Sequence, residues 1–324
     1  MNKVALIAAL AFAAAAPAFA ADMPVKAKKV AVVETPSPWD IAFGGGLMSD
    51  YVWRGVTQSG HKPSVTAYFE PRYNIDANWQ LYAGISGESI KFANNAAAEI
   101  DFYGGVRPTF GPVAFDVGYW YYYYPGGTCY VGNAACPNTI PNGNVAKASA
   151  SFYEVYGKVT YTIGDFAIGG NEFYSPNFLN TGAWGNYASA TVKYTAPTTM
   201  AIGPVGWYVS GEFGRQWLGT SDSFYGTSVA AAGFAGPFPN GIKYADYNTW
   251  NIGLGFTYKV FTLDLRYSDS DLSKGDCNAF TSDFTAPLSG NFTNINPSGA
   301  GSNWCGATFI AKLSADLTAM TSLK

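Results

Sequence analysis

The sequence has little charge, one histidine and no long apolar run beyond its first residues. Charged residues make up 13% of the 324 positions, against about 25% in soluble domains. After residue 20, no apolar run approaches the roughly 18 residues that a membrane-spanning helix needs. The net charge of −3 gives no case for a nucleic-acid partner. With aromatic residues at 17%, two classes remain: a large soluble β-protein or a transmembrane β-barrel, whose apolar residues are dispersed by alternation.

The first residues have the features of an export signal. Lys3 precedes an apolar run from 4 to 16, and Ala18-Phe19-Ala20 fits a signal-peptidase site. We therefore expect a signal peptide over residues 1–20 and a flexible periplasmic segment over 21–37. The barrel is expected over 38–324.

Four cysteines follow the expected signal. Cysteines of exported proteins meet an oxidising compartment and usually pair. The spacing favours Cys129–Cys136 and Cys277–Cys305, and each bond contributes roughly 2–4 kcal/mol by closing a loop. Neither pair has the spacing of a zinc site, and the lone His61 is far away in sequence. We expect disulfides, and no metal or cofactor.

Period-2 alternation is the dominant pattern of the remaining chain. Between residues 63 and 75 the odd positions are mostly apolar, whereas the even positions include Glu70 and Arg72. Each such run is long enough for the roughly 9–11 residues of a tilted membrane-spanning strand. Twelve runs are expected as strands: 41–53, 63–75, 79–90, 98–109, 112–124, 150–163, 165–176, 186–196, 204–217, 247–259, 261–271 and 307–317.

The lengths of the connections alternate as well. Turns after even-numbered strands are mostly short, such as 75–78 and 109–112, whereas those after odd-numbered strands include 125–149, 218–246 and 272–306. Short periplasmic turns and long extracellular loops are typical of outer-membrane barrels. A secreted β-sandwich would also alternate, but it has no reason to sort its loops in this way. The predicted fold class is all-β, a transmembrane antiparallel barrel of about twelve strands.

Two segments resemble a known family. SDYVWRGVTQS (49–59) is similar to the first-hairpin signature of the TorF family of Gram-negative porins, and FYSPNFLNTG (173–182) resembles that family's central motif. The likeness extends over about 38–317. It implies an outer-membrane barrel with porin activity.

The parity of the strands divides the charged residues between lipid and lumen. Those on the polar face are expected to line a pore for passive diffusion of small hydrophilic solutes or ions. Barrels of intermediate size can also be filled by side chains, so a closed structural or adhesive barrel is the alternative. The pore-lining candidates are Arg54, Glu70, Arg72, Arg107, Lys158, Lys193, Glu212, Asp264, Arg266 and Lys312.

A lipid hydrolase is a third hypothesis, because His61 has Ser59 and Ser64 nearby. A serine nucleophile needs a base within hydrogen-bond reach and a group that orients the base. The sequence contains no sign of that arrangement. We expect a non-enzymatic protein with His61 in an outer loop.

The run YWYYYYPGG (119–127) ends one of the predicted strands. Its odd positions continue the apolar parity, so they are expected in the aromatic girdle at the headgroup level. The even positions face the lumen. Girdle candidates are Tyr51, Trp53, Tyr119, Tyr121, Tyr123 and Trp217. The expected location is the cell outer membrane, with its lipids and small solutes or ions as partners and no nucleic acid.

Overall fold

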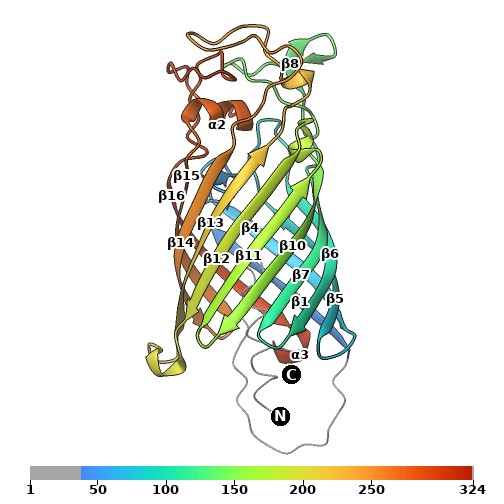
Figure 1. The fold of residues 1–324 in the computed structure, drawn as a ribbon, viewed down its shortest axis with the longest axis vertical. Coiled ribbons are helices and arrows are strands. Elements are labelled where there is room, and N and C mark those ends of the chain that lie inside the picture. The colour runs from blue at the N-terminus through green and yellow to red at the C-terminus, as the bar shows by residue number, and fades with distance from the viewer. Residues whose placement is uncertain (1–37, 323–324) are drawn as a thin grey trace, which may run out of the picture.

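Alternation along the chain gives each strand an apolar and a polar face, and the strands join edge to edge into a ring. The computed structural model describes residues 38–322, which contain a closed barrel of twelve antiparallel strands (Figure 1). The signal peptide expected over 1–20 and the segment expected over 21–37 lie outside the described residues. Along the ring the strands are β1 (Trp39–Met48), β4 (Ser64–Asn74), β5 (Trp79–Glu88), β6 (Glu99–Phe110), β7 (Val113–Tyr123), β10 (Phe152–Ile163), β11 (Phe166–Ser175), β12 (Gly185–Thr195), β13 (Gly206–Leu218), β14 (Tyr247–Tyr258), β15 (Phe261–Ser270) and β16 (Thr308–Thr318).

Pairing of the first and last strands closes the ring. Met48 at the end of β1 lies opposite Lys312 of β16 on one side and Ser64 of β4 on the other. Closure leaves no unpaired edge on which another chain could add a strand. The predicted fold class and the twelve strand positions are confirmed, except that the first strand ends at Met48 rather than at residue 53.

The connections sort by length as expected. The turns 75–78, 111–112, 164–165, 196–205 and 259–260 are at one end, and the longer connections are at the other. The turn 196–205 contains the 3-10 helix η2 (Thr198–Met200), and helix α3 (Ala319–Ser322) follows β16 at the same end (Figure 1). The long loops carry β2 (Val52–Trp53), β3 (Val56–Thr57), β8 (Tyr130–Asn133), β9 (Cys136–Pro137), η1 (Phe178–Asn180), η3 (Ser223–Tyr225) and α2 (Lys274–Thr281).

The two faces of the wall differ sharply. Large apolar side chains at mid-strand point outward, with Val117 52% and Ile252 58% exposed. The alternate positions, such as Asp116, are buried in the interior. An outward apolar band around a polar interior is the inverse of a soluble domain and suits a lipid environment.

Interior glycines make room for tyrosine rings. A Cβ at Gly214 would lie 2.2 Å from the hydroxyl oxygen of Tyr187, and one at Gly255 would lie 2.0 Å from Cζ of Tyr208. Each ring therefore lies over a neighbouring strand at a position where only glycine fits. These rings fill part of the lumen.

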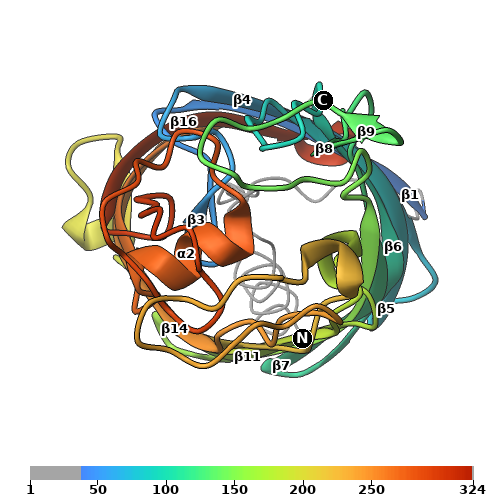
Figure 2. The same cartoon turned by 90° about the horizontal axis from the view of Figure 1, so that it is seen from above.

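Both predicted disulfides are present, Cys129–Cys136 and Cys277–Cys305. The first lies in the small β8–β9 hairpin, and the second joins α2 to the segment that leads into β16. Seen along the barrel axis, α2 and β3 lie inside the ring of strands (Figure 2). These two elements of the outer connections therefore lie over the lumen, whereas the β8–β9 hairpin lies at the rim (Figure 2).

Candidate functional site

A short hairpin folds into the lumen between β1 and β4. The chain leaves the wall after Met48, forms β2 and β3, and reverses at Arg54 and Gly55, whose φ angles are 48° and 76°. Two consecutive positive φ angles belong to a type I′ turn, which suits a two-residue hairpin loop. A Cβ at Gly55 would lie 2.6 Å from Oγ1 of Thr249, so the turn packs closely against β14. The hairpin therefore crosses the interior from one wall toward another.

Arg54 at the tip of the hairpin binds Glu154 of β10. The Nη1–Oε1 and Nη2–Oε2 distances are both 2.8 Å, and Nη1 also donates to Oε1 of Gln216 at 3.2 Å. The side chain of Glu154 has no solvent exposure and that of Arg54 has 5%. The guanidinium lies 4.1 Å from the ring centroid of Trp53 and 4.5 Å from that of Tyr187. A paired, stacked guanidinium is the form in which a buried arginine is tolerated.

Aromatic rings surround this ion pair at the outer end of the barrel. Trp53 stacks on Phe178 at 5.7 Å and contacts Tyr122 at 5.6 Å, and Tyr122 stacks on Phe152 at 4.5 Å. These rings belong to an apolar cluster that also includes Trp304 and residues of α2. The hairpin, four wall strands and five outer loops thus share one core at the outer end of the barrel. We call this assembly the outer plug.

A cavity of about 80 Å³ lies within the outer plug. Its walls include Trp53, Phe92, Tyr247, Phe280 and Trp304. The cavity is mostly apolar, and its size corresponds to a few water molecules.

The interior below the plug is polar and partly exposed. Arg266 of β15 donates to Asp264 at 3.0 Å and to Ser210 at 2.8 Å, and its side chain is 20% exposed. Lys193 lies over the ring of Tyr208 at 4.3 Å, and both residues are half-buried. We call this region, toward the short-turn end, the lower chamber.

A second network crosses the opposite wall. Arg107 donates to Glu70 at 2.7 Å and to Asp116 at 3.3 Å, and Arg72 donates to Glu70 at 2.6 Å. Lys158 is buried, with its Nζ 4.6 Å from the ring centroid of Tyr156. Interior charges of both signs are therefore held in fixed positions.

All ten pore-lining candidates lie inside the barrel. Nine project from wall strands, and Arg54 reaches the interior from the hairpin. Alternation alone did not indicate how the charges pair. Arg54 and Arg107 bind carboxylates of strands that are distant in sequence, whereas Arg72 and Arg266 bind a carboxylate two residues away on the same strand. Gln216, Tyr187 and Phe178, which surround Arg54, are absent from the predicted sites.

Two of the six girdle candidates are placed differently from the prediction. Tyr51 donates to Oε1 of Glu99 at 2.6 Å, and Trp53 packs within the plug, so both lie inside. The alternation continues beyond Met48, but the backbone has already left the wall. Tyr119, Tyr121, Tyr123 and Trp217 lie on the outward face, where Tyr119 is 44% exposed.

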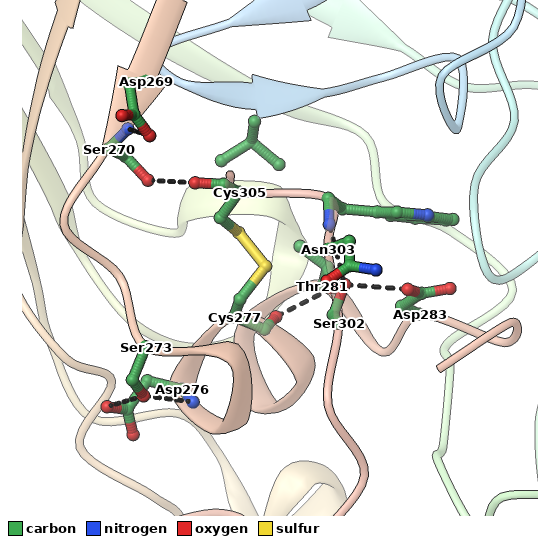
Figure 3. The surroundings of a disulfide bond; sticks show 12 residues. Asp269, Ser270, Ser273, Asp276, Cys277, Thr281, Asp283, Ser302, Asn303 and Cys305 are labelled. Atoms are coloured by element: carbon green, nitrogen blue, oxygen red, sulfur yellow. Dashed lines mark hydrogen bonds between the residues drawn. A yellow bond between two sulfur atoms is a disulfide. The ribbon is translucent and has the colours of Figure 1, made fainter. Parts of the chain in front are cut away.

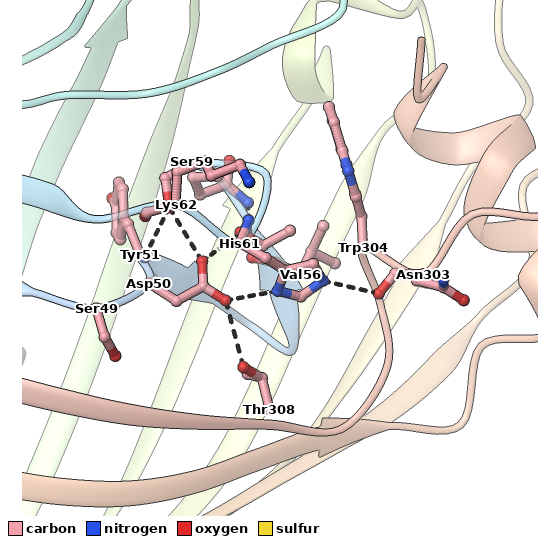
Figure 4. Close-up of polar contacts among 12 residues, drawn as sticks. Ser49, Asp50, Tyr51, Val56, Ser59, His61, Lys62, Asn303, Trp304 and Thr308 are labelled. Carbon is pink, nitrogen blue, oxygen red and sulfur yellow. Dashed lines mark hydrogen bonds and ion pairs between the residues drawn. The ribbon is translucent and has the colours of Figure 1, made fainter. Parts of the chain in front are cut away.

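His61 links two outer loops. Its Nδ1 lies 2.7 Å from Oδ2 of Asp50, and its Nε2 lies 3.0 Å from the carbonyl oxygen of Asn303 (Figure 4). Ser59 donates to Asp50 and to the carbonyl of Lys62, whereas Ser64 donates to backbone carbonyls. Both imidazole nitrogens thus have partners other than serine. The arrangement connects loops and has no nucleophile–base pair at His61.

Residues 32–216 match the model of a family described as bacterial protein of unknown function, Gcw_chp. The chain belongs to this family. The resemblance to the TorF family is not confirmed by this match. No curated protein matches the chain. Among residues 38–322, no helix is long and apolar enough to cross a membrane.

Several solved structures are similar at low identity. The COG4313 outer membrane channel from Pseudomonas putida F1 has 10% identity and a TM-score of 0.43, with 90% of this chain and 100% of that chain covered. The NanC porin has 9% identity and a TM-score of 0.41, with 86% and 100% covered. LpxR from Salmonella typhimurium has 11% identity and a TM-score of 0.37, with 86% and 99% covered. Likeness at this level gives no information about activity.

Proposed function

We propose that the protein is a gated channel of the outer membrane for passive diffusion of small hydrophilic solutes or ions. In this proposal the structure is the closed state, and the outer plug is the gate. The observation that carries the proposal is the contrast between the plug and the interior beside β12 and β15 below it. The lower chamber is polar and partly exposed, as with Arg266 at 20%, whereas Glu154 in the plug has no exposure.

The plug is a plausible gate because it is built from loops. The hairpin of β2 and β3 contacts the wall through its tip, and it forms a two-stranded sheet of its own, separate from the barrel ladder. Its withdrawal would leave the twelve wall strands paired. Loops folded over a rigid barrel can change position without a cost in barrel hydrogen bonds.

The outward apolar band, with its aromatic residues at the outer end of β7, supports residence among outer-membrane lipids. Paired charges inside the barrel support the second candidate, a closed structural or adhesive barrel. Conductance measurements distinguish the gated channel from the closed barrel. A gate can open, whereas a filled structural barrel conducts nothing.

The test uses purified full-length protein in planar bilayers. We expect wild type to open rarely, and a variant with residues 52–57 replaced by a short Gly-Ser linker to conduct continuously. The replacement removes the hairpin but none of the wall strands, and circular dichroism checks that the barrel is folded. Silence of the folded variant would reject the channel and favour the closed barrel.

A further inference from the structure

Three buried carboxylates meet at the outer ends of β5 and β6. Glu88 and Glu99 lie directly opposite each other in the ladder, and Asp101 is two residues further along β6. One oxygen from each lies within 4.8 Å of the others. Their exposed fractions are 5%, 2% and 3%. The wall thus holds three acidic groups together, away from water.

Two of the carboxylate oxygens have no partner among residues 38–322. Oε2 of Glu88 and Oδ1 of Asp101 are buried and have no partner with good hydrogen-bond geometry in this part of the chain, although the indole N–H of Trp120 lies near the Asp101 carboxylate. The other oxygen of Glu88 accepts from Thr66, and that of Asp101 accepts from Ser86. Leaving a buried acceptor unsatisfied is costly, and more so when it carries charge. These oxygens point to a positively charged ligand.

The surrounding protein supplies little compensating charge. None of the ion pairs among the described residues includes Glu88, Glu99 or Asp101. Lys312 of β16 acts electrostatically on Glu88. Elsewhere in this lumen, buried carboxylates such as Glu70 and Glu154 each pair with an arginine. The three carboxylates of the cluster have no such partner among residues 38–322.

We propose that Glu88, Glu99 and Asp101 bind a divalent cation that prefers oxygen ligands, with calcium as the type. Calcium–oxygen distances are about 2.3–2.6 Å, so an ion fits between oxygens separated by up to about twice that length. The two unpaired oxygens supply ligands directly. Glu99 accepts hydrogen bonds from Tyr51 at 2.6 Å and Tyr124 at 2.9 Å, which orient its carboxylate toward the cluster. The proposal does not depend on whether the barrel conducts.

Terbium luminescence in detergent micelles tests this site. Tb³⁺ replaces calcium at oxygen sites and emits when nearby aromatic rings are excited, and Tyr51 and Tyr124 contact Glu99 directly. We expect saturable emission from the full chain that Ca²⁺ displaces. The double substitution Glu88→Gln and Asp101→Asn should weaken binding by about tenfold or more. Glu212→Gln, an interior carboxylate outside the cluster, should leave it unchanged.

Absence of emission from wild type, or equal emission from the double variant, would overturn the proposal. An equal loss of terbium binding in Glu212→Gln would also overturn the proposal, because that result would indicate unspecific binding. If the double variant does not fold, thermal melting of the wild-type protein is measured instead. Calcium should raise the melting temperature above the value measured in EDTA. Identical melting curves would reject the cation site. They would indicate instead that the three carboxylates are protonated and share their protons.

Discussion

Arg54 and Glu154 form a two-pronged ion pair that joins the tip of an inward-folded hairpin to the barrel wall. Both N–O distances are 2.8 Å, and the carboxylate is completely buried. Removing one partner from such a pair leaves the other charge buried and uncompensated. The pair therefore resists movement of the hairpin even though the hairpin shares no ladder with the barrel.

The first prediction follows from this pair. Arg54→Ala should destabilise the plugged state by about 3–5 kcal/mol, because Glu154 loses its only counter-charge at hydrogen-bond distance among the described residues. In bilayer recordings the fraction of open time should rise. Arg215→Ala is the control, since Arg215 lies on the outward face beside Asn248. Equal open times for wild type and Arg54→Ala would contradict the role of the pair.

The sequence predicted the wall far better than the plug. In the wall the alternation holds, with Val117 and Ile252 on the outside, because a barrel strand must present every second residue to lipid. It failed at Tyr51 and Trp53, where the same parity continues through a hairpin that has left the wall. Period-2 patterns describe any extended strand and contain no information about whether it belongs to the ring. Nor could spacing predict that Arg54 meets Glu154, a hundred positions away.

The loop bridge formed by His61 should make the outer loops sensitive to pH. Both of its partners, the Asp50 carboxylate and the Asn303 carbonyl, are acceptors, so only a protonated imidazole donates to both. The hydrogen bond to Asp50 raises the pKa of His61 above its ordinary value despite burial, and Asp283 adds a weaker attraction. Burial alone would raise the pKa of Asp50, but the hydrogen bonds from His61 and Thr57 outweigh it and lower that pKa.

The directions of the two pKa shifts, for His61 and Asp50, define a range of pH in which the loops are most stable. A raised histidine pKa stabilises the fold fully below about pH 6.5, and the contribution is lost as pH rises through the folded pKa. A lowered aspartate pKa stabilises it above about pH 4, and that contribution is lost as pH falls through the folded value. We expect the loops to be most stable between about pH 4 and 6.5. Protection of the backbone amides of residues 57–61 against hydrogen exchange, corrected for the intrinsic rate at each pH, should be greatest there.

His61→Gln provides the control for this window. Glutamine keeps a hydrogen-bonding group but does not titrate, so the protection of these amides should lose its dependence on pH above about 6.5. A wild-type profile that is flat between pH 5.5 and 8.5 would contradict the bridge. So would a variant that retains the wild-type slope.

The two disulfides should differ in their effect on the plug. Cys277 and Cys305 are 28 residues apart, and both lie in the apolar cluster, where Ser270 donates to the carbonyl of Cys305 at 2.5 Å (Figure 3). Cys129 and Cys136 are seven residues apart in the outer β8–β9 hairpin. Replacing Cys277 and Cys305 by serine should destabilise the outer loops by about 3–4 kcal/mol, as the loop-entropy model gives for a loop of this length.

The matched control replaces Cys129 and Cys136 by serine, with an expected cost of about 2–3 kcal/mol confined to their own hairpin. Hydrogen exchange of α2 measures the difference. Faster exchange is expected for the first pair of substitutions and an unchanged rate for the second. Equal exchange in the two variants would mean that the bond at Cys277 does not hold α2 in the plug.

The outward apolar face can be tested separately from the lumen. Ile252 is at the middle of β14 and 58% exposed, so in a membrane it contacts the hydrocarbon core. Ile252→Arg should destabilise the folded barrel in lipid by about 2–4 kcal/mol, because a guanidinium at the bilayer midplane loses its hydration. Val229→Arg is the control, since Val229 is 64% exposed but belongs to the loop between β13 and β14. Urea unfolding in vesicles gives both values, and equal midpoints for the two variants would mean that the apolar band does not contact lipid.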